Sequence, residues 1–134
     1  MLNDLKKKVE YEKIPKALWL CLNYTETHKQ DINTIGAAWV DDNKFILNTF
    51  IFSKFINRKI HTINRNLREH SFKTKKIGYS ERSHLFSLLN LNPLLERSWC
   101  LRDHKDFTRY SEEKIIDQIP YKSIPKKSCQ IKIS

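Results

Sequence analysis

Hydrophobic residues recur every three or four positions in the first third of the chain and then in short runs separated by turns. From Ile14-Pro15 onward, one side of a helix collects the apolar residues Ala17, Leu18, Cys21 and Leu22, with Thr25 beside them. Proline suits the first turn of a helix, where its missing N–H is not needed. The pattern predicts a helix with one buried face from residue 14, preceded by a flexible basic arm over residues 1–13.

Short elements are predicted next. A second helix is expected from about residue 30 to residue 35, ending at Gly36. Two β-like runs, 38–40 and 44–47, flank an Asp41-Asp42-Asn43 turn, which is the pattern of a hairpin. The paired carboxylates in that turn are interpreted as structural, because aspartate is favoured in turns for backbone reasons.

Two consecutive helices follow the hairpin. Asn48-Thr49 offers an N-cap for a helix over residues 50–56, and Asn57 can adopt the left-handed conformation that closes it. An amphipathic helix is then predicted over Lys59–Lys73. Helices of about 7 and 14 residues, joined by a turn of three or four, have the proportions of a helix-turn-helix.

The second of these helices carries the candidate binding residues. Ile60, Ile63 and Leu67 lie on one face, and the opposite face and its flanks are polar and basic. The candidate contacts to DNA bases are Lys59, His61, Thr62, Asn64, Arg65 and Arg68. Such side chains donate to and accept from base edges, and arginine suits bidentate contact with guanine. An ordinary solvated face has the same pattern, so this spacing alone leaves both interpretations open.

Charge favours the binding interpretation. The chain has 25 Lys+Arg against 15 Asp+Glu, a formal net charge of +10. Such a surface attracts polyanions, of which nucleic acid is the common one. After the helix comes a basic run, predicted to form a β-wing that contacts phosphates, with Lys73, Lys75, Lys76 and Arg82 as candidates. Residues 97–102 are expected to form the returning strand of the wing.

Other apolar residues indicate an aromatic core and a second apolar segment whose role the sequence leaves open. An aromatic core is expected beneath the recognition helix. It consists of Trp39, Trp99, Phe45, Phe50, Phe52 and Phe55. The apolar patch Leu85–Leu95 fits a short helix, a hairpin tip or an interaction surface. Residues 111–134 are expected to be a loose or partly docked C-terminal extension.

Little in the sequence indicates catalysis or a cofactor. Cys100-x-x-x-His104 is half a zinc site without a second clustered pair. The five histidines are scattered without an obvious carboxylate or nucleophile partner, and two glycines leave no phosphate-cradling loop. Three cysteines without a pairing framework favour a reducing compartment, and no apolar run approaches the roughly 18 residues of a membrane span. We expect no enzyme, no cofactor, no small-molecule substrate and no membrane partner.

Four local motifs between Ile14 and Arg109 resemble the trichomonad initiator-binding domain. They are Ile35-Gly36-Ala37-Ala38-Trp39-Val40, the following Phe45, Thr62-Ile63-Asn64-Arg65-Asn66-Leu67-Arg68, and Trp99 with Phe107-Thr108-Arg109. The family pattern has an Ile-Gly-x-x-Trp entry, a Thr-x-Asn-x-Asn-Leu-Arg recognition helix and a closing Phe-Thr-Arg. The recognition-helix motif is the most specific of these.

The resemblance implies an α+β, mainly α, winged-helix fold over residues 14–110. It further implies binding to double-stranded core-promoter DNA in the nucleus, with proteins of the transcription machinery as further partners. Thr62, Asn64, Asn66 and Arg68 fall on the family's recognition-helix motif. Arg65 stands where an apolar residue suits the family, and the segment from Phe72 to Trp99 is longer than expected. The expected target is therefore the initiator element or a related promoter motif.

Two alternatives stay open. A winged helix can instead serve protein interaction, with the Leu85–Leu95 patch as its working surface. RNA binding is a third reading, although the chain lacks the aromatic-and-glycine motif that RNA-recognition sheets use for stacking.

Overall fold

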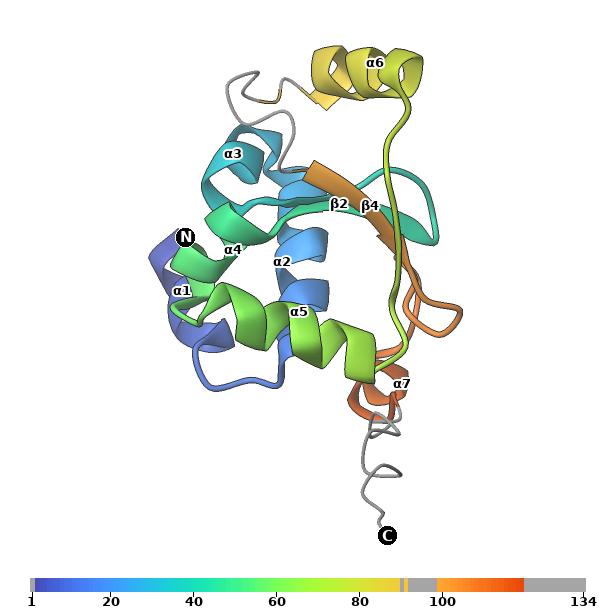
Figure 1. Cartoon of the computed structure of the whole chain (residues 1–134). Coiled ribbons are helices and arrows are strands. Elements are labelled where there is room, and N and C mark those ends of the chain that lie inside the picture. Colours follow the sequence, from blue (N-terminus) through green and yellow to red (C-terminus); the bar gives the residue numbers. More distant parts are fainter. Residues whose placement is uncertain (1, 90, 92–98, 120–134) are drawn as a thin grey trace, which may run out of the picture.

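The computed structural model describes residues 2–89, 91 and 99–119, in which helices surround one four-stranded sheet (Figure 1). The helices are α1 (Leu2–Val9), α2 (Ile14–Thr27), the 3-10 turn η1 (Lys29–Asp31), α3 (Ile32–Ile35), α4 (Thr49–Ile56), α5 (Ile60–Glu69), α6 (Tyr79–Leu89) and α7 (Glu113–Asp117). The strands are β1 (Ala37–Trp39), β2 (Lys44–Asn48), β3 (Lys73–Lys75) and β4 (Trp99–Asp103). The fold is a mixed α/β structure and mostly helical.

The sheet has the order β1-β2-β4-β3, and every pairing is antiparallel. The predicted hairpin is β1 with β2, in which Trp39 lies opposite Phe45. The predicted returning strand of the wing is β4, which pairs with β3 on one side and β2 on the other. Side chains alternate across a strand, so Phe45 and Leu47 enter one core while Ile46 enters another.

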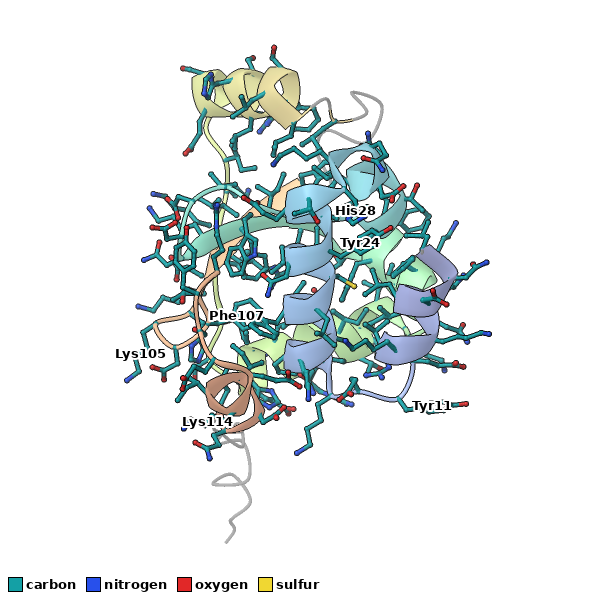
Figure 2. All side chains as sticks on the ribbon, turned by 180° about the vertical axis from the view of Figure 1, so that it is seen from behind. Tyr11, Tyr24, His28, Lys105, Phe107 and Lys114 are labelled. Carbon is teal, nitrogen blue, oxygen red and sulfur yellow. The ribbon has the colours of Figure 1, made fainter. Side chains whose placement is uncertain are left out.

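The larger core lies between the sheet and the helices α1, α2, α4 and α5. Figure 2 shows α2 crossing the back of the molecule, with α5 behind it. The apolar stripe predicted for α2 is fully buried. Four aromatic rings meet beside it: Phe107 lies 5.4 Å from Phe45, 4.9 Å from Phe72 and 5.8 Å from Trp39, between ring centroids.

Two members of the expected aromatic core lie elsewhere. Trp99 is buried on the other face of the sheet, because the register of β4 places it on the side of Leu101 and Ile46. Phe50 is 46% exposed, since the buried stripe of α4 runs through Phe52, Phe55 and Ile56. The Lys54 ammonium lies 4.3 Å from the Phe50 ring centroid.

The smaller core consists of the outer face of the sheet and α6. Leu85 and Leu89 of α6 are buried with Ile77, Leu91 and the outer face of the sheet. Leu88 points away and is 66% exposed. The described part of the Leu85–Leu95 patch is therefore largely a core and not a surface; Leu94 and Leu95 lie outside the described residues.

The N-terminal segment differs from the flexible arm that we expected. Residues 2–9 form α1, whose Leu5 and Val9 are buried in the larger core. Arg58 holds the end of this segment, since its Nη2 donates to the carbonyls of Val9, Glu10 and Glu12. A basic, polar segment is thus held to the core by two apolar side chains and by the hydrogen bonds of one arginine that is distant in sequence.

The C-terminal segment is docked as far as the structure describes it. Ile116 of α7 and Ile119 are buried, and Lys16 of α2 lies 2.7 Å from Glu113. Trp19, which lies off the buried stripe of α2 and is half-buried, donates from Nε1 to the Thr108 carbonyl at 3.1 Å. The remainder of the predicted extension, residues 120–134, lies outside the described residues.

Candidate nucleic-acid interface

Three residues separate α4 from α5, and Asn57, the first of them, turns the chain. Asn57 has φ 58°, and its N–H and that of Arg58 both donate to the Ser53 carbonyl. Asparagine tolerates this left-handed conformation better than most residues. The N-cap predicted at the other end of α4 is also present, because Asn48 Oδ1 accepts from the Ile51 N–H at 3.1 Å.

Helix α5 is shorter than the predicted Lys59–Lys73 helix. It has 10 residues and ends at Glu69 because Ser71 adopts φ 69°. The Phe72 N–H then donates to the Leu67 carbonyl at 2.9 Å, which closes the helix and turns the Phe72 ring into the core. Lys73 therefore lies on β3 and not on the helix.

The outward face of α5 is basic. His61, Arg65 and Arg68 are exposed, and Lys59 is exposed just before the first turn. Thr62 and Asn64 are half-buried on opposite flanks of this face. The structure thus places five of the six predicted base-contact residues on the outward face of α5 and its two flanks, and the sixth, Lys59, at the N-terminal end of the helix.

The inward face fixes α5 to the core. Ile63 and Leu67 are fully buried, as predicted. Ile60 differs: it is 38% exposed, because it is the first residue of the helix and lies at the edge of the packed region. Two buried aliphatic side chains, one helical turn apart, therefore anchor the helix.

Asn64 forms a hydrogen bond with a distant residue that the sequence pattern did not predict. Arg102 of β4 donates from Nη2 to Asn64 Oδ1 at 3.2 Å. Burial lowers the pKa of the Arg102 guanidinium, and no described residue bonds its Nε. The pair spans 38 positions of sequence, so no local pattern reports it. It joins α5 to the central strand pair of the sheet.

The other flank of α5 borders a cavity of about 400 Å³. It is lined by Lys13, Ile14, Arg58, Thr62, Asn66 and His70. Asn66 is half-buried, and its Oδ1 has no hydrogen-bond partner among the described residues. Thr62 opens onto both this cavity and the outward face, so it is better placed than Asn66 to contact a ligand.

Three of the four predicted phosphate contacts lie along the strand after α5. Lys73 and Lys75 of β3 are exposed, as is Lys76 after it. In Figure 1 the chain rises from the end of α5 past β4 to α6. These lysines therefore extend the basic surface from the end of α5 up one edge of the sheet.

Arg82 does not join that surface. It belongs to α6, which Figure 1 shows at the opposite end of the molecule from α5. Its Nη2 donates to the Ile77 carbonyl at 3.2 Å, and its side chain is half-buried. The segment that we expected to continue as a wing through Arg82 is instead strand only over β3, and Arg82 lies in a helix.

The described residues show little that fits metal binding or nucleophilic chemistry. Within residues 2–89, 91 and 99–119, no three His, Cys, Asp or Glu side chains are grouped as ligands for a metal ion. Burial raises the pKa of the Cys21 thiol well above its ordinary value. In the same part of the chain, no helix has the length and apolar character needed to cross a membrane.

Comparison with known proteins identifies one family. The model of the transcription-initiator DNA-binding domain matches residues 2–106. No curated protein matches the chain. Among solved structures, the Initiator binding domain of T. vaginalis IBP39, bound to the alpha-SCS Inr element, matches with a TM-score of 0.61 at 20% identity. The alignment covers 81% of this chain and 93% of that one, so the two share a fold.

Proposed function

Because the chain belongs to the family of transcription-initiator DNA-binding domains, we propose that it binds double-stranded DNA sequence-specifically at a core-promoter element. The target is an initiator or a related motif, and the action is in transcription initiation or its regulation. The observation that carries the proposal is the outward face of α5, where Arg65, Arg68 and His61 are exposed over a helix anchored from below by Ile63 and Leu67. The family is a DNA-binding family and not one of enzymes.

The binding mode that fits is that of a winged helix. α5 enters the major groove, α4 crosses the backbone as the first helix of a helix-turn-helix, and β3 with β4 forms the wing. Arg65 and Arg68 contact base edges, with Lys59, His61, Thr62 and Asn64 around them. Lys73, Lys75 and Lys76 contact phosphates. A protein that acts on promoter DNA in this way works in the nucleus.

The functional unit includes α1, whose Leu5 and Val9 belong to the core. It extends at least to Ile119, because Ile116 and Ile119 also belong to the core. The protein-interaction alternative is less well supported, since among the described residues of the Leu85–Leu95 patch Leu85, Leu89 and Leu91 are buried and Leu88 is exposed.

Selection of bound duplexes from a random pool tests the proposal. A single enriched motif is expected, and Arg65→Ala or Arg68→Ala should weaken binding to it by about 1–3 kcal/mol, with relaxed preference at one position. Lys75→Ala or Lys76→Ala should weaken binding to all duplexes alike and lower the salt slope by about one unit. A pool that shows no enrichment contradicts the proposal.

A further inference from the structure

A basic groove of about 390 Å³ lies between α1 and α4, beside the turn that leads into α5. Lys6 and Lys7 of α1 line it from one side and Lys54 of α4 from the other. Its apolar lining includes Phe55, and it reaches Asn57 in the turn before the recognition helix. The groove adjoins the interface described above but shares none of its predicted contact residues.

The groove is built into the fold. Leu5 and Val9 fix α1 to the larger core, and Arg58 fixes the carbonyls at the end of α1 to the turn that precedes α5. Arg58 is next to Lys59, the first of the predicted contact residues. The lysines of α1 therefore have a fixed position relative to the start of α5.

The charge of the groove is positive. Its lining has three lysines, Lys6, Lys7 and Lys54, and one carboxylate, Glu10. In the described part of the chain none of these three ammonium groups forms an ion pair. Lys6 lies 5.9 Å from the centroid of the Phe55 ring, an apolar support that leaves its N–H donors available.

We propose that this groove binds the phosphodiester backbone of the same duplex that α5 reads, on the side of the start of α5. The inference rests on the proposed function. In helix-turn-helix complexes the first helix crosses the DNA backbone, and here that helix is α4, which carries Lys54 in its last turn. Lys6 and Lys7 face the same groove from α1 and extend the contact outward to flanking phosphates. Three ammonium groups around an open groove complement a polyanionic strand.

The test measures the salt dependence of binding to the selected site with flanks of different length. The variant combines Lys6→Ala, Lys7→Ala and Lys54→Ala. Loss of three phosphate contacts should lower the salt slope by about 2.7 units. Over a fourfold rise in salt, the wild type should then lose about 40-fold more affinity than the variant. The difference in salt slope between wild type and variant should disappear when the duplex is trimmed at the end that lies beside the start of α5. It should persist when the duplex is trimmed at the other end.

A matched control combines Lys29→Ala, Lys105→Ala and Lys114→Ala. It makes the same change in net charge away from the groove; Figure 2 labels two of these lysines on the rear face. A second control replaces the three groove lysines with arginine, which keeps the charge and should keep the slope. Far-UV circular dichroism checks that every variant is folded.

The outcomes separate the two proposals. If the wild type selects a motif but the groove variant behaves like the alanine control, the groove does not bind the backbone and fits another occupant, such as an acidic protein segment. The inference is also wrong if the loss is undiminished after trimming at either end. A wild type without any sequence preference removes the proposed function itself, and this inference with it.

Discussion

The contact between Arg102 and Asn64 determines which atoms of Asn64 face outward. A guanidinium has donors and no acceptor, so the amide atom that it contacts must be the oxygen. The Asn64 NH2 group then points away from Arg102. Bidentate contact with adenine requires both amide atoms, whereas a free NH2 group alone favours a base that offers an acceptor. Asn64 is therefore expected to read one base position as a donor.

Replacement of either partner should change that position alone. Asn64→Asp keeps an acceptor for Arg102 but presents an oxygen where the NH2 group was, so we expect a loss of about 1–3 kcal/mol and a different preferred base. Arg102→Met releases the amide and should relax the preference at the same position. Selection of bound duplexes with each variant measures both effects; unchanged preferences in the Arg102→Met protein would contradict this assignment.

His104 predicts how stability depends on pH. Its ring is buried, and the centroids of the His104 and Phe72 rings lie 4.9 Å apart. His104 Nδ1 accepts a hydrogen bond from the Asp106 N–H at 3.0 Å. Burial lowers the pKa of His104 from its ordinary value of 6.5. The group is neutral when folded, so its contribution is complete above pH 6.5 and is lost as the pH falls through the lowered pKa.

We therefore expect the urea midpoint to fall as the pH is lowered from about 7.5 to about 5. His104→Asn retains an acceptor for the Asp106 N–H and removes the titrating ring. Its midpoint should depend less on pH than that of the wild type. Equal pH dependence of the two proteins would show that another group is responsible.

At the scale of elements, α6 stabilises the outer face of the sheet through one side of a short helix. Leu85 is 4% exposed and Leu88 is 66% exposed, although both are leucines in the same helix. Leu85→Ala should cost about 2–5 kcal/mol of the free energy of unfolding, and Leu88→Ala about 0.5 kcal/mol or less. Urea denaturation of the two variants measures the difference. Comparable losses from both substitutions would mean that Leu88 is also covered.

Elements whose signals are local were predictable from the sequence. Gly36 ends α3 with φ 88°, and Asn48 and Asn57 bound α4, as their residue types indicated. Elements that depend on distant partners were not. The end of α1 is bonded by the distant Arg58, although Leu2, Leu5 and Val9 do show helical spacing.

In the candidate site, too, the features with local signals were predictable and those that depend on distant partners were not. The exposed positions of α5 follow from its periodicity, since Ile63 and Leu67 determine which face is buried. The role of Arg102 and the location of Arg82 depend on strand register and on a helix between β3 and β4, which no local pattern shows. The groove between α1 and α4 was missed because α1 itself was expected to be flexible.

At the scale of the whole molecule, the segment after β4 completes the core. Phe107 is fully buried among the rings of Trp39, Phe45 and Phe72, and it lies just beyond the residues matched by the family model. Arg109 then binds Glu26 of α2 at 2.7 Å. The helix that supports α5 from behind, α2, is thus held in part by residues that follow β4.

A chain that ends after residue 106 should consequently be much less stable than one that ends after residue 119. Phe107→Ala in the full chain should cost about 3–5 kcal/mol, while Tyr110→Ala, at a residue that is 73% exposed, should cost about 0.5 kcal/mol or less. Thermal unfolding followed by circular dichroism compares the four proteins. Equal melting temperatures for the two truncated chains would contradict the structural role of residues 107–119.

The order of the sheet also bears on how such a protein can diverge. β3 and β4 are neighbours, yet residues 76–98 separate them, and α6 lies within that connection. The entropic cost of closing a loop rises by only about 0.6 kcal/mol for each doubling of its length. The position of α5 depends instead on Ile63, Leu67 and the Phe72 ring. Insertions and deletions in this connection can therefore accumulate during evolution while the outward face of α5 keeps its position.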